Sequence, residues 1–497
     1  MRVLRFLLLA IVLGAVGAFW WTSRTPAPDL EATTSTAVVG QESTLNVVVD
    51  THGGQLSQLD IALEQGGTVT PLFALPGNEE TKLTQLDANR IQLTRAIGRK
   101  AVATLKDGSA VVHVTATTPI TFGWRARTSS LSKALTVRLT PPRVSVLSSF
   151  HFVNHGGSEM VVYRVTPADA ASGVRVGDVR YAGYPASAAG VAGADPSLKV
   201  AFFALLHDQD LGTPMTVYAQ DDAGNAGTAA VEVRVFPKPF RRSRIEIDDA
   251  FLSRVVPAIE QGSPNFAFHD ASDLLGSYLQ INGDMRAEND ETLKALADKT
   301  APQKLWEGPF KQLTNSQVEA SFADHRTYYY KGKEIDQRVH LGFDLAVTSG
   351  VAVTAANRGI VTWANFLGIY GNCVVIDHGM GVQSLYAHLS SIEVKEGDKV
   401  ERDQPLGRSG QTGLAGGDHL HFTMLVGGHA VNPVDWWSAQ WIEDRLMRKL
   451  REAQSPTADT PSSSTPTAAS SAPAVRASGS GAGAGRSPKS RRGRTGR

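Results

Sequence analysis

Short runs of β-branched and other apolar residues, broken by Gly, Pro and Asp, recur over the first half of the chain and set the strongest limit on its fold. Examples are Leu45-Asn-Val-Val-Val49, Ala110-Val-Val-His-Val114 and Met160-Val-Val-Tyr-Arg-Val165. Such runs are typical of strands that end in tight turns. Modules of about 100 residues each fit the available length. After a polar linker over 26–37, we therefore expect β-sandwich modules at 38–138 and 139–237, in a mainly β protein.

The second of these modules ends on a recognisable turn. Val217-Tyr-Ala-Gln-Asp-Asp-Ala-Gly-Asn225, followed by the apolar run 229–235, resembles the closing strands of bacterial Ig-like domains, in which Asp-x-Ala-Gly-Asn makes the turn. The resemblance implies an Ig-like β-sandwich over 139–237.

His and Asp residues with the spacing of metal ligands lie in the C-terminal half. They occur in His340-Leu-Gly-Phe-Asp344, Tyr386-Ala-His388 and His419-Leu-His421. Gly342 disfavours a helix for the first group. On a strand, alternate residues share a face, which places His340 and Asp344 together, with Gly342 leaving room for an ion, and aligns His419 with His421. Two imidazoles, one carboxylate and an open coordination position are typical of catalytic zinc.

Three blocks of this region, HLGFDLA, SLYAHLS and GDHLHF, followed by Val431-Asn432-Pro433, resemble the M23 family of LytM/lysostaphin-type zinc metallopeptidases. The resemblance implies an antiparallel β peptidase domain over 315–437 that holds one zinc ion. Carried over residue by residue, it implies that the zinc ligands are His340, Asp344 and His421. It also implies that His388 and His419 are the catalytic pair beside the metal-bound water.

Members of this family hydrolyse peptidoglycan, so the resemblance implies a zinc-dependent endopeptidase that cuts its peptide bonds. Stem-peptide cross-links are the substrate that we expect; a glycine-containing bridge or a protein substrate stays open. Family members with lost ligands act as non-catalytic activators, and a peptidoglycan-binding or hydrolase-activating protein is the alternative. No ligand position is lost in this sequence, which favours the enzyme.

The segments between the three blocks favour antiparallel strands. Cys373-Val-Val-Ile-Asp377 and 382–389 flank a glycine-rich turn and predict a hairpin, in which His388 shares a face with Tyr386 and Ser384. The segment 394–407 also resembles biotinyl and lipoyl carrier domains. No Met-Lys element is present, however, so we infer a related topology and not a carrier function.

Several further residues of this region receive no catalytic role. His378 and His429 lie in glycine-rich segments, match no ligand position and are expected to be solvated loop residues. An upstream tyrosine often assists the oxyanion in the M23 family. Tyr328, Tyr329 and Tyr330 precede His340, but a strand of the entering hairpin explains them equally well, and none is assigned.

Helical patterns flank the catalytic region. A helical segment is expected over 245–308, and its position suggests that it packs over the catalytic cleft as a regulator. An amphipathic helix over 438–453 should dock on the protein. The final segment, 455–497, is rich in Ser, Thr, Ala, Pro and Gly and ends in basic residues, which predicts a disordered basic tail.

The N-terminal segment predicts export. Two arginines precede the uninterrupted apolar run Phe6 to Trp21, as in a secretion signal or a short signal anchor. We expect an uncleaved anchor over 1–24, with the N-terminus in the cytoplasm and the catalytic domain in the periplasm of a single-pass inner-membrane protein. Peptidoglycan and the inner membrane are then the expected partners, and nucleic acid is not.

The remaining sequence features decide less. The single cysteine, Cys373, excludes an internal disulfide and a thiolate-rich zinc site, and its apolar neighbours predict burial. Two roles stay open for the β-sandwich modules. They are either spacers that hold the peptidase away from the membrane or binding modules for a partner or a wall polymer, and we favour spacers.

Overall fold

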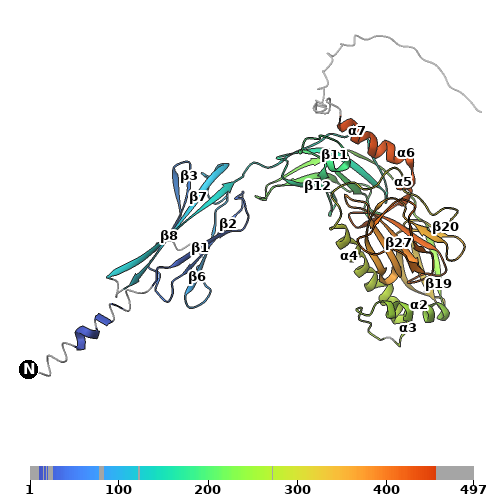
Figure 1. Ribbon diagram of the computed structural model, residues 1–497, viewed down its shortest axis with the longest axis horizontal. Helices are drawn as coiled ribbons and strands as arrows, with labels where there is room; N and C mark the ends of the chain where they lie inside the picture. Colours follow the sequence, from blue (N-terminus) through green and yellow to red (C-terminus); the bar gives the residue numbers. More distant parts are fainter. Residues whose placement is uncertain are drawn as a thin grey trace, which may run out of the picture. The chain divides into compact units, whose positions relative to one another are not determined.

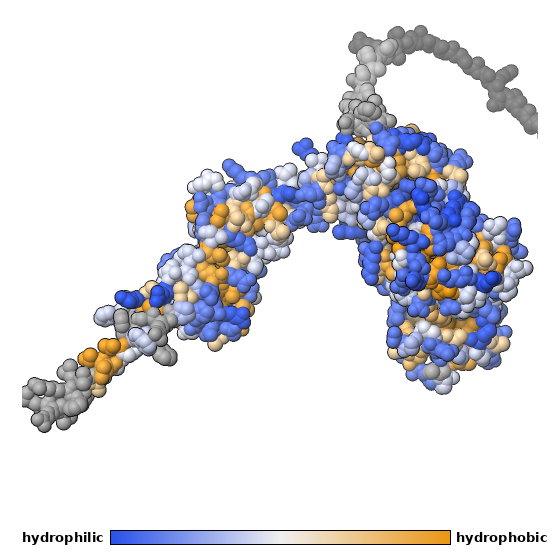
Figure 2. Space-filling view, in the orientation of Figure 1, coloured by the Kyte–Doolittle hydropathy of each residue, from blue (hydrophilic) through white to orange (hydrophobic). Residues whose placement is uncertain are grey.

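The computed structural model describes residues 10–14, 16–17, 20, 26–77, 83–120, 124–270 and 272–454. Much of the predicted anchor over 1–24 and all of the predicted tail over 455–497 fall outside these ranges. In the described ranges, no helix is both long and apolar enough to cross a membrane. The apolar side chains described near the N-terminus, such as Ile11, Leu13 and Trp20, are exposed (Figure 2).

The N-terminal module consists of two antiparallel sheets around a core of their own. The sheet orders are β1-β2-β6-β5 and β4-β3-β7-β8. Buried residues alternate along β2, where Leu45, Val47 and Val49 point inward, so one face of the sheet is apolar. The strands are β1 (Asp29–Thr34), β2 (Thr44–Asp50), β3 (Gln58–Gln65), β4 (Thr68–Leu75), β5 (Leu83–Gln85), β6 (Arg90–Ala96), β7 (Gly108–Ile120) and β8 (Arg125–Val137).

Strand β1 lies in the segment 26–37, so the expectation of a linker there was wrong. It pairs with β2 along its whole length. Ala32 is buried in the core of the module and Leu30 packs against that core. Burial of these two apolar side chains favours a strand over a solvated linker.

The second module also has two main sheets, with the orders β14-β15-β11-β9 and β13-β12-β16-β17, and a parallel pair β10-β18. Asp221 makes the turn before β17, because its Oδ1 accepts hydrogen bonds from the backbone N–H groups of Ala223 (3.0 Å) and Asn225 (2.9 Å). The Ig-like assignment stays a prediction. The elements are β9 (Arg143–Val146), β10 (His151–Asn154), β11 (Ser158–Thr166), β12 (Ala171–Val176), β13 (Val179–Ala182), β14 (Tyr184–Pro185), η2 (Ala186–Ala189), β15 (Leu198–Ala204), β16 (Met215–Gln220), β17 (Ala226–Ala230) and β18 (Val233–Phe236).

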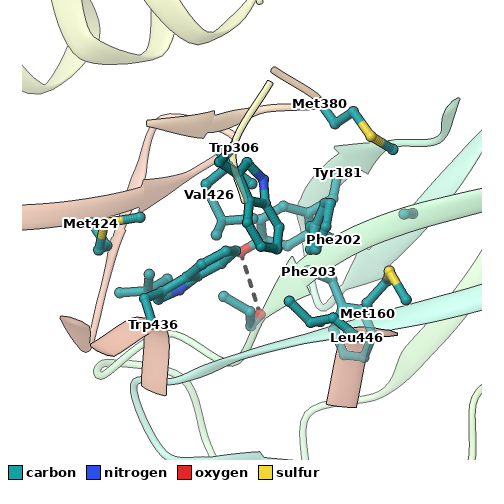
Figure 3. Packing of buried hydrophobic residues seen from close by; sticks show 14 of the residues in the cluster. Met160, Tyr181, Phe202, Phe203, Trp306, Met380, Met424, Val426, Trp436 and Leu446 are labelled. Atoms are coloured by element: carbon teal, nitrogen blue, oxygen red, sulfur yellow. Dashed lines mark hydrogen bonds between the residues drawn. The ribbon is translucent and has the colours of Figure 1, made fainter. Parts of the chain in front are cut away.

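The core of the second module continues into the C-terminal part of the chain. Figure 3 shows Phe202 beside Trp306 and Trp436, with ring centroids 6.5 and 5.9 Å apart. Trp436 also donates from Nε1 to Ser158 Oγ at 3.0 Å. Since these residues belong to one buried cluster, the second module is joined to the C-terminal domain by a shared hydrophobic core.

The C-terminal domain is organised around one sheet with the order β20-β23-β31-β27-β26-β25-β29, and β32 pairs with β31. Two smaller sheets, β19-β21-β22 and β24-β30-β28, complete it. The expected hairpin is present as β26 and β27. The elements are β19 (Arg242–Ile247), β20 (Gln317–Ala320), β21 (Asp324–Tyr330), β22 (Lys333–His340), β23 (Phe343–Ala346), β24 (Ala352–Thr354), β25 (Gly359–Phe366), η4 (Gly368–Tyr370), β26 (Asn372–Asp377), β27 (Val382–Leu389), β28 (Ser391–Ile392), β29 (Lys399–Val400), β30 (Pro405–Arg408), β31 (Leu420–Val426) and β32 (His429–Val431).

Helices lie before the main sheet of this domain in the sequence, between β19 and β20, and after its last strand. The helical segment contains α2 (Asp249–Gly262), α3 (Leu274–Gln280), η3 (Ile281–Met285) and α4 (Arg286–Ala297), and Asp248 caps α2 by accepting from the Phe251 N–H at 2.7 Å. These helices pack on β21 and η4 through a buried cluster that includes Val256, Tyr278 and Tyr328. Figure 1 shows α2, α3 and α4 at the periphery of the C-terminal domain. The chain then ends in α5 (Pro433–Trp437), α6 (Ala439–Trp441), η5 (Ile442–Met447) and α7 (Arg448–Ala453).

The C-terminal helix docks on the protein, as expected. Ile442, Leu446 and Leu450 are buried in the same cluster as the second module. Lys449 lies among them and pairs with Glu159 of β11 at 2.8 Å.

Candidate metal centre

Asp344 and His421 face each other across two neighbouring strands. Asp344 on β23 is the register partner of His421 on β31. Because side chains of directly opposed residues point to the same side of a sheet, the carboxylate and the imidazole meet, and His421 Nδ1 lies 3.0 Å from Asp344 Oδ1.

His340 reaches this pair from a different sheet. It ends β22, and the chain leaves strand conformation at Leu341 and Gly342 before β23 begins. The expectation of one continuous strand was therefore wrong. A Cβ on Gly342 would lie 2.5 Å from both Cε1 and Nε2 of His421. The glycine thus makes room for the ring of a candidate ligand, and not for an ion between His340 and Asp344.

Three side-chain atoms converge at the centre of this cluster. His340 Nε2 lies 2.9 Å from Asp344 Oδ1 and 3.0 Å from His421 Nδ1. These separations approach the ligand spacing of about 3.4 Å expected for tetrahedral zinc with bonds of about 2.1 Å.

The outer hydrogen bonds fix which nitrogen of each imidazole is protonated. His340 Nδ1 faces the Ser321 carbonyl at 3.3 Å, so Nδ1 is the donor. His421 Nε2 faces Thr423 Oγ1 at 3.0 Å, and that hydroxyl donates its proton to the Leu341 carbonyl at 2.9 Å. His421 Nε2 is therefore also a donor. Both inner nitrogens turn lone pairs toward the Asp344 carboxylate, an arrangement that a cation stabilises.

The second oxygen of Asp344 binds an arginine. Arg326 donates to Asp344 Oδ2 at 2.8 Å, which fixes the plane of the carboxylate. The positive charge of this guanidinium favours the ionised form of the buried carboxylate. The carboxylate is therefore ionised, as a metal ligand must be.

A β-bulge turns His388 toward the cluster. Two residues of β27, Ala387 and His388, oppose Cys373 alone, and His388 has a left-handed φ of 62°. The bulge breaks the alternation of the strand. The ring centroid of Tyr386 lies 5.4 Å from that of Phe422. The ring of His388 instead packs on the neighbouring residue of β31, His421, with centroids 5.7 Å apart.

Phe422 and His421 point to opposite faces of β31. The expectation that His388 shares a face with Tyr386 and Ser384 was therefore wrong. The strained backbone of His388 is typical of a side chain held in place for a function.

His388 and His419 form a second pair beside the three converging atoms. Their ring centroids lie 4.8 Å apart. Each donates from Nδ1 to a backbone carbonyl, His388 to Thr412 at 2.8 Å and His419 to Gly417 at 2.9 Å. Each Nε2 is therefore left unprotonated in the neutral ring, and His419 Nε2 lies 3.4 Å from Asp344 Oδ1.

The structure corrects the placement of two other histidines. His378 was expected in a solvated loop but is fully buried; it hydrogen-bonds to the Arg358 carbonyl (2.8 Å) and Ser384 Oγ (2.7 Å), and burial lowers its pKa to about 4. His429 begins strand β32 and is half-buried against Tyr181. Neither of them reaches the metal cluster.

The three consecutive tyrosines are strand residues of β21. The guanidinium of Arg244 stacks on the ring of Tyr329, with Cζ 3.6 Å from the ring centroid. The Tyr330 hydroxyl donates to Asp249 at 2.6 Å. Tyr328 is buried in the helical cluster and lines the cavity in front of the metal cluster.

This cavity has a volume of about 590 Å³ and contains all five histidine and aspartate residues of the candidate site in its lining. The sequence reasoning missed three other contributors. Thr423 and Arg326 hold the candidate ligands, and Tyr370 packs on His421 at 5.8 Å. Thr423 directly follows the GDHLHF block and Arg326 lies just before the tyrosine run, but neither position reveals a contact, and Tyr370 carries no such signal.

A buried His-Asp-His cluster with two further histidines beside it has the donor set typical of metal centres in metallohydrolases. Residues 338–433 match the model of Peptidase family M23. This part of the chain is accordingly an M23 peptidase domain.

Curated relatives resemble this chain mainly over the same domain. The DD-carboxypeptidase/endopeptidase Mpg of Neisseria meningitidis is 42% identical over 97 residues, which are 20% of this chain and 22% of that protein. The peptidoglycan DD-endopeptidase ShyA of Vibrio cholerae is 32% identical over 158 residues, 31% of this chain and 33% of that protein. The murein hydrolase activator EnvC of Escherichia coli is 37% identical over 95 residues, 19% of this chain and 23% of that protein. The similarity therefore spans a third or less of each relative.

Proposed function

We propose that this protein is a zinc-dependent endopeptidase that hydrolyses peptide bonds in peptidoglycan, with stem-peptide cross-links as its substrate. One observation carries the proposal: the inner atoms of His340, Asp344 and His421 lie within 3.0 Å of one another and all present lone pairs. The similarity to Mpg, a DD-carboxypeptidase/endopeptidase, and to ShyA, a peptidoglycan DD-endopeptidase, supports the choice of substrate.

The donor set suits zinc, which three N and O ligands bind while leaving a position for water. When bound, zinc would lower the pKa of that water and polarise the scissile carbonyl. His388 and His419 each present Nε2 to the same cavity. One of them accepts the proton of the attacking water, and this proton then passes from the imidazole pair to the departing amine.

Burial lowers the pKa of His421 to about 4 and that of His388 well below its usual value. Neutral imidazoles are required both for metal binding and for accepting a proton. The hydrogen bonds from Nδ1 to the Thr412 and Gly417 carbonyls keep both catalytic rings oriented, so that little reorganisation is needed during the reaction.

A substrate in the cell wall requires a location outside the cytoplasm. We propose that residues 1–24 anchor the chain in the inner membrane, with the peptidase domain in the periplasm. Cell fractionation of the full chain, and of a variant in which a cleavable secretion signal replaces residues 1–24, tests this: the variant should move from the membrane to the soluble exported fraction. Retention of the variant in the membrane would contradict the anchor.

The enzymatic proposal is tested by measuring bound zinc and the release of peptides from purified sacculi. We expect His340→Ala to lose both zinc and peptide release, and His388→Ala to keep zinc but lose release. His429→Ala, which changes a histidine outside the cluster, should retain both. Peptide release that survives His340→Ala would refute the assignment.

The alternative is a non-catalytic activator with an M23 domain, and the similarity to EnvC favours it. An activator would bind sacculi and increase release by a separate hydrolase, while releasing nothing alone. Incubation of the purified protein with sacculi, with no other hydrolase present, separates the two functions.

A further inference from the structure

The walls of the cavity in front of the metal cluster come largely from outside the family match. Strand β19, helix α2 and the helices α3 to α4 contribute residues such as Arg242, Phe251, Tyr278 and Arg286 to its lining, whereas the M23 match begins at residue 338. The helical segment therefore forms part of the walls of this cavity. A regulatory role for it stays a prediction.

Arginine is the only basic residue type other than histidine in this lining. Five arginines and four carboxylates line the cavity. Arg244 pairs with Glu246 at 2.7 Å. Arg326 pairs with Asp344 at 2.8 Å and lies 3.5 Å from Asp324. Two of the five arginines thus neutralise three of the four carboxylates.

Among the described residues, the other three arginines make no ion pair with a carboxylate, although Arg286 acts through its charge on the partly buried Asp290 of α4. Arg241 donates to the Glu319 carbonyl at 3.0 Å. Arg286 donates to Asn282, from Nη2 to Oδ1 at 2.6 Å and from Nε to the carbonyl at 3.3 Å. Arg242 is exposed and its side chain makes no hydrogen bond or ion pair within the described part of the chain. Cationic groups in the cavity are consequently available to an anion.

Arg286 is held in a defined position. Asn282, its partner, is fully buried; it donates from Nδ2 to Asp336 at 2.8 Å, and its carbonyl accepts from Arg338 Nε at 2.6 Å. A guanidinium that is held in this way loses little entropy when it binds a planar carboxylate through two parallel hydrogen bonds.

We propose that Arg242 and Arg286 bind carboxylate groups of the peptide substrate and make the cavity selective for peptides with free carboxylates close to the scissile bond. This inference rests on the proposed peptidase function. It adds a substrate preference to that function, and this preference comes from β19 and α4, which lie outside the residues that match the M23 family. They are specificity-determining residues, and the hydrolytic chemistry does not depend on them.

Binding to the metal-free protein tests the inference separately from catalysis. The full chain is treated with EDTA, and the affinities of a synthetic stem tetrapeptide with free carboxylates and of the same peptide with its carboxylates amidated are measured by calorimetry. We expect the wild type to bind the free acid at least about 10-fold more tightly, the effect of one charge-assisted hydrogen bond. Arg242→Gln and Arg286→Gln should each remove most of this preference and leave the affinity for the amidated peptide unchanged.

Arg175→Gln is the matched control, because Arg175 is exposed on β12 and does not line the cavity. It should keep the preference for the free acid. Arg242→Gln changes an exposed side chain, so it reports even if Arg286→Gln disturbs the helix. Equal affinity of the wild type for both peptides, or a preference unaltered in both variants, would overturn the inference. If the wild type preferred the free-acid peptide but released no peptides from sacculi, the result would count against the proposed function alone.

Discussion

Gly342 lies against the imidazole of His421, so close that a Cβ at this position would stand 2.5 Å from two ring atoms. The residue is therefore tied to the orientation of a candidate zinc ligand, although it binds nothing itself.

Gly342→Ala should displace the His421 ring and lower zinc affinity by about 10- to 100-fold, the usual effect of disturbing the support of a metal ligand. Competition with a chelator measures the affinity, and circular dichroism checks the fold. Gly212→Ala is the control, because a Cβ there would meet no atom within 4 Å and should change nothing. Unaltered zinc affinity in Gly342→Ala would show that the close approach has no functional weight.

Thr423→Val should have a similar effect for a different reason. The variant keeps the size of the side chain but removes the oxygen that accepts the Nε2–H of His421, so the ring is free to turn or to move its proton to Nδ1. We expect zinc affinity to fall by about 10-fold and Thr423→Ser, which keeps the hydroxyl, to remain close to wild type. Chelator competition again provides the measurement, and equal affinities of the Val and Ser variants would exclude this role.

The ion pair between Lys449 and Glu159 should contribute to the attachment of the C-terminal helix. Its side chains are 2% and 0% exposed. Lys449→Met leaves the Glu159 carboxylate buried without its cation and should cost about 3–5 kcal/mol in the free energy of unfolding. Urea unfolding followed by circular dichroism measures this cost.

The exposed pair Arg451–Glu443 on the same helix supplies the control. Arg451→Gln should cost much less than Lys449→Met, because water screens exposed ion pairs. If the two variants were equally stable, the buried pair would have no special weight.

Asp435 should make stability depend on pH in the mildly acidic range. Burial raises its pKa from 3.8 to about 6, so between these values the folded protein binds a proton that the unfolded chain releases. Stability from this group is present at low pH and is lost as pH rises from about 4 to 6, by up to about 3 kcal/mol. Relative to wild type, Asp435→Asn should therefore become more stable as pH rises through this window.

Urea midpoints of the wild type and Asp435→Asn at pH 4 and pH 7 test this sign. A constant difference between wild type and Asp435→Asn at both pH values would mean that the carboxyl is already ionised in the folded protein at pH 4.

Local sequence patterns were sufficient for several parts of the structure. Alternation of apolar residues predicted strands such as β2 and the hairpin of β26 and β27, because side chains two residues apart face the same side of a strand. The block pattern named His340, Asp344, His388, His419 and His421, and the structure places all five in the lining of one cavity.

Local patterns failed where a distant segment decided the outcome. His378 stands in a glycine-rich turn, a typical place for a solvated side chain, yet packing of Phe310 against its ring at 4.8 Å buries it. The sequence analysis missed strand β1 because Leu30 and Ala32 are its only apolar residues, which is too few for a clear strand pattern. The break between β22 and β23 and the bulge at His388 likewise depend on the strands that each residue meets.

Short sequence motifs were enough to predict the candidate ligand residues and the mainly β fold, because residue types and the two-residue period of strands are local properties of the chain. Tertiary structure decided the orientation of the imidazoles, the bulge that aims His388, the core shared by the second module and the peptidase domain, and the arginines that reach the cavity from β19 and α4. These features arise from contacts between segments tens to hundreds of residues apart, which no local pattern contains.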